Sequence, residues 1–255
     1  MELRVLGCHG GESPRHRTTA FMLDDRLAID AGALTSQLTL PDQDRLAGVL
    51  VSHAHMDHIR DLATIADNRC QRECGTLDIV GTKATIGHLR NHFFNDILWP
   101  DFTKIPSGGQ PTVRYVEIPV EQPTDVLGYK VTAVDVNHTI ESAAFIIDDG
   151  KGVIGFSGDT GPTDRFWEVF NQQDNVRALL MEVSFPDRET GIALVSGHHT
   201  PRTLLEDLKK YKAPQDLPTM LYHIKPTFQA EVERECAKLK KVNLHVLKLT
   251  DQFIL

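Results

Sequence analysis

The chain alternates between short apolar runs and polar, turn-forming stretches, a pattern typical of β-strands separated by loops. The runs that predict strands lie at residues 3–6, 20–23, 27–29, 49–51, 113–118, 130–136, 143–147, 153–156, 178–183, 219–222 and 243–247. Segments 82–94 and 202–211 place apolar residues three or four positions apart and predict amphipathic helices. Weaker helical patterns cover residues 164–170 and 227–239.

Strands and helices follow one another without the regular alternation of a single parallel sheet. We therefore expect an α/β (α+β) fold with two mixed β-sheets covered by helices, in one domain over residues 1–255. Residues 91–128 begin with aromatic side chains and continue, after residue 101, with many Pro, Gly and Thr residues. This segment is predicted to be a loop with a short strand, lying near a functional site.

The composition narrows the class of protein. Lys and Arg number 27 against 35 Asp and Glu, which gives a formal charge of −8 and argues against a large nucleic-acid partner. No apolar run approaches the ~20 residues of a membrane span, and the N-terminus lacks the pattern of a signal peptide. A cytoplasmic protein is expected, with free cysteines; the Cys70 and Cys74 pair has no partner pair at metal-finger spacing.

Histidines are the unusual component, with 12 in the chain. Directly after the predicted strand 49–51, four potential metal ligands fall within six residues: His53, His55, Asp57 and His58. Imidazole and carboxylate together suit zinc, and to a lesser degree manganese or iron. The density of these residues after a buried strand favours a metal site over a solvated loop.

Three further ligand-competent residues occupy the same kind of position. His138, Asp159 and His223 each follow the end of a predicted strand. Side chains at the carboxyl ends of neighbouring strands can converge, so we expect these three to complete the site.

The set His53-x-His55-x-Asp57-His58, His138, Asp159 and His223 resembles the metallo-β-lactamase fold of metallohydrolases, as do Leu6-Gly-x-x-Gly-Gly11 and Ile29-Asp30-x-Gly32. The resemblance implies an αββα sandwich with two divalent metal ions. It assigns His53, His55 and His138 to one metal, Asp57, His58 and His223 to the other, and Asp159 to a bridge between them. It also implies that Asp30 orients a ligand from behind; the alternative is a turn residue before Gly32.

Four other segments are similar to class II cyclic-nucleotide phosphodiesterases: residues 91–102, Glu182-x-Ser-Phe-Pro186, Gly197-His-His-Thr-Pro201 and His223-Ile-Lys-Pro226. This similarity implies hydrolysis of 3′,5′-cyclic AMP, or of cyclic GMP, to the 5′-monophosphate by a metal-bridging hydroxide. The alternatives are another phosphodiester, such as a small cyclic phosphate sugar or an RNA 3′ end as in tRNA-processing nucleases. A non-catalytic module of the same fold is a third class, which the complete ligand set disfavours.

The catalytic residues expected are Asp57 and His198. Thr200 and Pro201 predict the start of a helix, and helix N-termini attract phosphate. His198, just before that helix, is predicted to hold the phosphate or to protonate the leaving 3′ oxygen, with His199 as the other candidate. The departures from the family pattern are His199 itself and the Arg60-Asp-Leu62 segment.

The aromatic segment has two competing uses. Phe94, Trp99 or Phe102 would stack on a purine, or would pack in the interface of a homodimer. Asn95 is a candidate for a hydrogen bond to the base or sugar, and Lys225 for a contact with the phosphate, unless Lys225 only ends a strand. The expected partner is a small anionic cyclic nucleotide, with no nucleic acid and no membrane.

Overall fold

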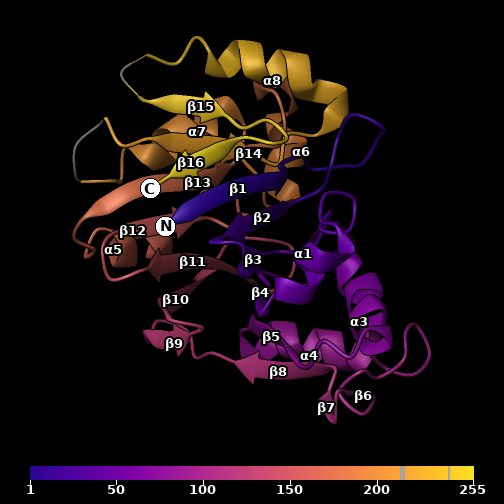
Figure 1. Ribbon diagram of the computed structural model, residues 1–255. Helices are drawn as coiled ribbons and strands as arrows, with labels where there is room; N and C mark the ends of the chain where they lie inside the picture. The colour runs from indigo at the N-terminus through magenta and orange to yellow at the C-terminus, as the bar shows by residue number, and fades with distance from the viewer. Residues whose placement is uncertain (213–215, 241) are drawn as a thin grey trace.

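The computed structural model describes residues 1–212, 216–240 and 242–255, and shows two mixed β-sheets face to face (Figure 1). Across the first sheet the strands are β16 (Gln252–Ile254), β1 (Glu2–Gly7), β2 (Ala20–Leu23), β3 (Leu27–Ile29), β4 (Gly48–Leu50), β5 (Leu77–Gly81) and β8 (Val113–Glu117). Across the second sheet they are β15 (Leu244–Val246), β14 (Thr219–Tyr222), β13 (Val176–Glu182), β12 (Val153–Phe156), β11 (Ser142–Asp148), β10 (Tyr129–Val136) and β9 (Thr124–Val126). Each sheet has a parallel half, β3-β4-β5-β8 or β12-β13-β14-β15, and the remaining pairs are antiparallel.

Helices cover the outer face of each sheet. The helices of the first half are α1 (Leu40–Arg45), α2 (Met56–Ile59), α3 (Asp61–Gln71) and α4 (Lys83–His92), and those of the second half are α5 (Arg165–Phe170), α6 (Thr190–Val195), α7 (Pro201–Leu208) and α8 (Gln229–Cys236). Apolar residues of α3 and α4 share one buried cluster with the first sheet, and those of α5, α7 and α8 share another with the second sheet. The predicted αββα sandwich is confirmed.

A third cluster fills the space between the sheets, and β11 shows how the sequence divides its side chains between two cores. Ala143, Phe145 and Ile147 belong to the cluster between the sheets, whereas Ala144 and Ile146 belong to the cluster under the helices. This alternation is the period of two expected for a strand with both faces covered. It explains why the strand reads as a continuous apolar run.

The predicted helices are present with small shifts: α4, α5, α7 and α8 fall inside the predicted ranges 82–94, 164–170, 202–211 and 227–239, except that α7 begins one residue early. The prediction omitted the short helices α1, α2 and α6, the edge strands β9 and β16, and the longer elements β5 and α3. In β5 the apolar run is broken by Asp78, whose carboxylate accepts two hydrogen bonds of 2.8 Å from Arg114 on β8. In α3 the buried face includes Arg69, which donates to backbone carbonyl groups such as Gln43 O, so the apolar period is weak.

The segment after residue 101 contains more strand than the one short strand predicted. Two short strands, β6 (Pro106–Ser107) and β7 (Gln110–Pro111), pair with each other, and Ser107 lies against α3, donating to Arg69 O. The chain then forms β8 at the edge of the first sheet and β9 at the edge of the second. The part that approaches the site is shorter, from His92 to Leu98.

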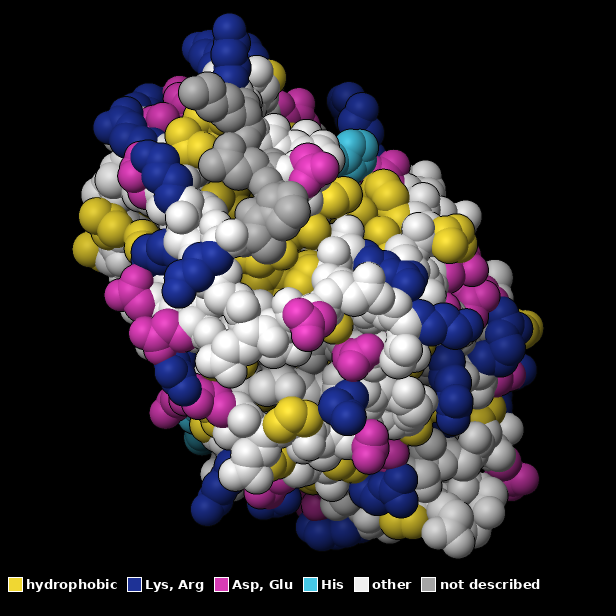
Figure 2. All heavy atoms as spheres, turned by 90° about the vertical axis from the view of Figure 1, so that its left-hand side faces the viewer, with side chains coloured by type: hydrophobic (Ala, Val, Ile, Leu, Met, Phe, Trp, Pro, Cys, Tyr) yellow, Lys and Arg dark blue, Asp and Glu magenta, His cyan; other side chains and the backbone are white. Residues whose placement is uncertain are grey.

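The surface carries charges of both signs. Figure 2 shows acidic and basic side chains interspersed over one face, without a broad basic area among its described residues. The four cysteines are free, and none belongs to a potential metal-ligand group in the described part of the chain. Over the same part, every helix is too short or too polar to cross a membrane.

Candidate metal centre

The chain turns sharply after β4, and this turn distributes four of the predicted ligands. His53 and His55 lie in the extended stretch that follows the strand, and His55 is the N-cap of α2. Asp57 and His58 lie within α2 itself, so they project from a different stretch of backbone. The second sheet supplies the other three from loops directly after its strands: His138 follows β10, Asp159 follows β12 and His223 follows β14.

The carboxylate of Asp30 fixes the turn from behind. Its Oδ1 accepts from the Ser52 backbone N–H at 2.8 Å, and its Oδ2 accepts from the Ser52 hydroxyl at 2.9 Å and from His58 Nδ1 at 2.7 Å. Asp30 is fully buried and has a positive φ of 57°. The Asp30 carboxylate thus contacts both Ser52 and the ring of His58.

The first cluster consists of His53, His55 and His138. His55 Nδ1 lies 3.0 Å from His53 Nε2 and 3.1 Å from His138 Nε2. The ligand atoms of the three residues lie within 4.8 Å of one another.

Hydrogen bonds on the far side of these rings show which nitrogens carry protons. The Ser52 hydroxyl donates to Asp30, so it accepts from His53 Nδ1–H, at 3.0 Å. His138 Nδ1–H donates to the backbone carbonyl of Gly197 at 2.9 Å. The Nε2 atoms of His53 and His138 therefore present lone pairs to the centre of the cluster.

The second cluster consists of Asp57, His58 and His223, and it has the same organisation. His223 Nε2 lies 3.3 Å from Asp57 Oδ2 and 3.4 Å from His58 Nε2. His58 donates from Nδ1 to Asp30. The Ser184 hydroxyl donates to Glu182 at 2.9 Å and accepts from His223 Nδ1–H at 2.9 Å. In their neutral forms both rings turn an unprotonated Nε2 inwards.

Asp159 lies between the two clusters. Its Oδ2 is 3.1 Å from His223 Nε2, 3.2 Å from His58 Nε2 and 3.9 Å from His53 Nε2. Its Oδ1 is buried and, within the described residues, has no hydrogen-bond partner. A buried carboxylate oxygen without a donor is costly unless a cation completes it.

These observations test whether divalent metal ions fit the residues present, and they do. Ring nitrogens and carboxylate oxygens face one another at about the distance of a hydrogen bond, and apart from a proton on His58 no protons lie between them. Cations between them remove the repulsion, and imidazole and carboxylate are the ligand types that such ions use. All seven predicted ligands are brought together, in the two sets and with the shared Asp159 that the family resemblance implies.

The pKa shifts in the protein without metal are also consistent with a site for divalent metal ions. Burial lowers the pKa of His53, His55, His138 and His223, which keeps their ligand atoms unprotonated near neutral pH. Burial alone would also lower the pKa of His58, but Asp159 and Asp30 beside it raise that pKa well above its usual value. A proton on His58 therefore supplies the positive charge that a metal ion supplies in the loaded site.

His198 lies against the centre without belonging to either ligand set. Its ring stacks on His223, with centroids 5.2 Å apart, and lies 5.0 Å from the ring of His138. Its Nδ1 is 3.2 Å from Glu182 Oε1 and 3.3 Å from the Ser184 hydroxyl. Burial lowers the pKa of His198 to about 4.

Glu182 is a residue whose role the sequence did not predict. It is fully buried at the end of β13 and contacts His198 Nδ1, the Ser184 hydroxyl and the backbone N–H of His199, the last at 2.9 Å. Burial raises the pKa of Glu182 to about 7. Glu182 and Ser184 thus orient both His198 and His223; the only signal in the sequence was their position after a buried strand.

An apolar pocket of about 250 Å³ opens beside the first cluster. Ala54 lies between two ligands in the sequence, Met56 precedes Asp57, and Ile140 is two residues after His138. The far wall comes from α4 and the segment after it. The complete lining is Ala54, Met56, Ile59, His88, His92, Phe93, Leu98 and Ile140.

The family model described as a beta-lactamase superfamily domain matches residues 25–224 of this chain. The chain belongs to the beta-lactamase superfamily. A crystal structure of unliganded yeast PDE1 is similar over 100% of this chain and 99% of its own, with a TM-score of 0.82 and 18% sequence identity.

Two bacterial relatives of this chain are named for an enzymatic activity. A probable 3′,5′-cyclic-nucleotide phosphodiesterase of Yersinia pestis is 26% identical over 89% of this chain and 79% of its own length. A 3′,5′-cyclic-nucleotide phosphodiesterase of Aliivibrio fischeri is 28% identical over 87% of this chain and 80% of its own length. The resemblance drawn from the motifs is confirmed, and the chain is a hydrolase of the superfamily.

Two of the predicted substrate contacts have other roles in this superfamily member. His199 is fully buried, with Nδ1 3.1 Å from the Thr203 hydroxyl, and so cannot touch a substrate. Thr200 begins α7 as predicted, but it is also fully buried, and its hydroxyl and backbone N–H are bonded to Thr203 in a capping box. Of the two adjacent histidines, the structure brings only His198 to the centre.

The aromatic segment is also used differently from the prediction. Phe94 and Phe102 are buried in the core under α3 and α4, which excludes them from base stacking and from a subunit interface. The side chain of Asn95 is bonded within the local turn: it accepts from the N–H groups of Ile97 and Leu98 and donates to Asn91 O. Trp99 is partly exposed but does not line the apolar pocket, where Leu98 does.

Replacing Asp30 by Asn is expected to weaken metal binding about 10- to 100-fold. Every partner of the Asp30 carboxylate is a donor, so an amide N–H₂ would face another donor and release Ser52 or His58. The measurement is the dissociation constant for zinc, obtained by competition with a chelator. Asp25→Asn is the control, because Asp25 is an exposed aspartate that also has a positive φ, of 52°. Equal zinc affinity in Asp30→Asn and the unmodified protein would contradict the role of Asp30.

Replacing Glu182 by Gln is expected to change how stability depends on pH. The pKa of Glu182 is about 7 in the fold against 4.5 for a free Glu, so the folded state binds the extra proton between these values. Its contribution to stability is complete below pH 4.5 and is lost as the pH rises through 7. In chelator-treated protein, the free energy of unfolding of Glu182→Gln relative to wild type should increase from pH 5 to pH 8. Exposed Glu206→Gln should show no such trend, and a flat difference for Glu182→Gln would refute the prediction.

Proposed function

We propose that this chain is a metal-dependent phosphodiesterase that hydrolyses 3′,5′-cyclic AMP, or another 3′,5′-cyclic nucleotide, to the 5′-monophosphate. The observation that carries the proposal is the sharing of Asp159 between two clusters of unprotonated ligands, beside an apolar pocket. The names of the two bacterial relatives support the substrate class.

The metal ions of this proposal are two Zn²⁺, held by the two ligand sets with Asp159 between them. When bound, such ions activate water as a nucleophile near neutral pH and offset the charge of the phosphate. They also account for an anionic substrate on a chain of formal charge −8, because four positive charges are added where the phosphate must lie.

His198 is the proposed proton donor. In the reaction a water oxygen bonds to phosphorus, the bond between phosphorus and the 3′ oxygen breaks, and that oxygen takes up a proton. Glu182 holds Nδ1 of the ring, while one ring nitrogen of His198 lies within 4.8 Å of ligand atoms of both His138 and Asp159. In this proposal the ring lies where the leaving oxygen would be, and Glu182 orients it through Nδ1.

Lys225 is the proposed counter-charge for the phosphate. It follows His223 by two residues, its backbone N–H donates to Ser184 O, and its charge lowers the pKa of both His198 and His223. The ammonium group is thus close enough to act electrostatically on the centre, on the side of His198.

The apolar pocket is the proposed site for the nucleobase. A purine is flat, uncharged and largely apolar on its faces, which suits a lining dominated by Met56, Leu98 and Ile140. The polar lining groups are His88, which pairs with Glu141, and His92. With so few groups to read the edges of a base, the pocket favours binding of a purine over discrimination between adenine and guanine.

The decisive experiment is hydrolysis of cyclic AMP and cyclic GMP by zinc-loaded protein, with the product identified as the 5′- or 3′-monophosphate. Release of 5′-AMP that stops on chelation and returns with metal supports the proposal. Asp159→Ala and Asp57→Ala should lower kcat/KM by about 10³-fold, since metal-ion charge stabilisation is worth several kcal/mol. Full zinc loading with no turnover of either nucleotide, alongside cleavage of an RNA 3′ end or a cyclic phosphate sugar, would replace the proposed substrate.

His198→Ala should lower kcat for cyclic AMP by about 10²–10⁴-fold and leave the zinc content unchanged. The loss should be much smaller for bis(p-nitrophenyl) phosphate, because nitrophenolate leaves without a proton. His245→Ala, on an exposed histidine paired with Asp251, is the control. Equal losses for the two substrates would exclude proton donation by His198.

Leu98→Asp should raise KM for cyclic AMP about tenfold by placing a charge against the base, with a smaller change in kcat. Its neighbour provides a matched control, since Ile97 is 91% exposed and does not line the pocket. Ile97→Asp should therefore behave like wild type. If Ile97→Asp and Leu98→Asp give the same KM, the base does not bind in this pocket.

A further inference from the structure

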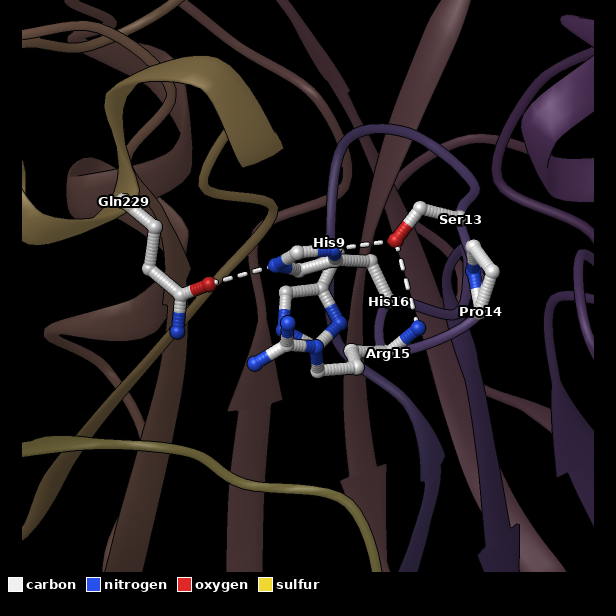
Figure 3. Close-up of a pocket in the computed structure, with 6 residues that line it drawn as sticks. All are labelled: His9, Ser13, Pro14, Arg15, His16 and Gln229. Carbon is white, nitrogen blue, oxygen red and sulfur yellow. Dashed lines mark hydrogen bonds between the residues drawn. The ribbon is translucent and has the colours of Figure 1, made fainter.

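A second, polar pocket lies outside the metal centre, between α8 and the loop that joins β1 to β2 (Figure 3). Its volume is about 700 Å³, enough for a small metabolite. The six residues that line it are His9, Ser13, Pro14, Arg15, His16 and Gln229. None of them belongs to the two ligand sets.

The walls of this pocket are held by an internal network. The Ser13 hydroxyl accepts from the Arg15 backbone N–H at 3.2 Å and bonds to His16 Nδ1. On its other side His16 Nε2 donates to Gln229 Oε1 at 2.7 Å. The rings of His9 and His16 meet edge to face, with centroids 4.7 Å apart. The loop is thereby fixed to α8 before any ligand arrives.

Two groups in the pocket have no hydrogen-bond partner within the part of the chain that the structure describes. His9 Nδ1 lies 3.2 Å from the Arg17 backbone N–H and 3.3 Å from the Arg17 carbonyl oxygen, whereas His9 Nε2 has no partner there. The Arg15 guanidinium has no carboxylate oxygen within 4.0 Å. Figure 3 shows its side chain turned back toward the two imidazole rings. An arginine carries its charge at every working pH.

The acidic residues around the loop are engaged elsewhere. Glu12 pairs with Arg17 at 3.4 Å and with Arg60 at 3.1 Å. Glu233 accepts from Gln229 Nε2 at 2.8 Å. Neither of these carboxylates pairs with Arg15, so the guanidinium keeps its donors available for a ligand.

We propose that this pocket binds a phosphate group, as inorganic phosphate or as the phosphate monoester of a small metabolite, apart from the metal centre. The planar guanidinium of Arg15 can hold two phosphate oxygens, and His9 Nε2, when it carries a proton, is a further donor on the same loop. The volume exceeds what bare phosphate needs, which leaves room for the organic part of a mononucleotide.

The same loop is braced against the metal centre. Cys8 O accepts from the His223 backbone N–H at 2.7 Å, and the Gly10 N–H donates to Ile224 O at 3.1 Å. Gly10 packs so closely that a Cβ there would lie 2.5 Å from His223 O. A phosphate held by Arg15 therefore restrains the loop on which the ligand His223 rests.

The test is calorimetric titration of zinc-loaded protein with inorganic phosphate and, separately, with 5′-AMP. Wild type should show two binding events, one at the metal centre and one at the pocket. Arg15→Gln should weaken the pocket event at least about tenfold and keep the other. Arg26→Gln, on an exposed arginine of the β2–β3 turn, should keep both. A pocket event that is tighter with 5′-AMP identifies a nucleotide as the ligand, and equal affinities identify free phosphate.

NMR signals of the histidine rings locate the bound phosphate without relying on the number of calorimetric binding events. Phosphate should shift the His9 and His16 ring resonances in wild type and in Arg26→Gln, but not in Arg15→Gln at the same concentration. Equal thermal transitions of the three proteins would show that the variants are folded. Identical titrations and identical His9 and His16 shifts in Arg15→Gln and wild type would overturn the proposal. If wild type binds phosphate at the pocket but shows no binding event at the metal centre, the result counts against the proposed function and not against the pocket.

Discussion

The structure depends on one electrostatic constraint: lone pairs and carboxylate oxygens from two different sheets point at the same small volume. They are held there because four of the five inward rings have an outward partner, namely Ser52, Asp30, Ser184 or the carbonyl of Gly197. These partners are buried, so they cannot exchange their bonds for water without cost. The two layers of the sandwich must therefore meet in one register, since a shift of either sheet would separate the halves of the centre.

That register is maintained against local preference. Asp30 has φ 57° and His223 has φ 68°, in the left-handed region that non-glycine residues rarely occupy. Such positions cost about 1–3 kcal/mol each and persist only where the surroundings impose them. At His223 the surroundings are the backbone of Cys8 and the close approach of Gly10; at Asp30 they are three donors on a single carboxylate. Strain is thus concentrated on the residues that aim the ligands.

Much of this could be predicted from the sequence, and the failures have a common cause. The ligands cluster after strand ends, where the apolar pattern is strongest, so the candidate ligands and two mixed sheets could be predicted from the residues, whereas the αββα sandwich followed from the family resemblance. Asn95 and His199 were misjudged because the turn and the core that occupy them are tertiary features. Glu182 has no distinguishing local pattern; its role follows only from β13 lying beside the loop that carries His198. Likewise Asp78 and Arg69 interrupt the apolar pattern of β5 and α3. In the fold, Asp78 pairs with Arg114 and Arg69 donates to backbone carbonyl groups.

The site has a buried floor and an exposed rim, and these lie on different kinds of structure. Four of the ligands, His53, His58, Asp159 and His223, are buried together with their supports, whereas Met56 and Leu98, on the wall of the apolar pocket, are each more than half exposed. A substitution in the floor disturbs several neighbours at once, while one in the rim disturbs few. Substitutions that accumulate in the rim can therefore change the substrate specificity while the catalytic centre stays the same. One reaction centre can in this way be carried through a lineage whose substrates change.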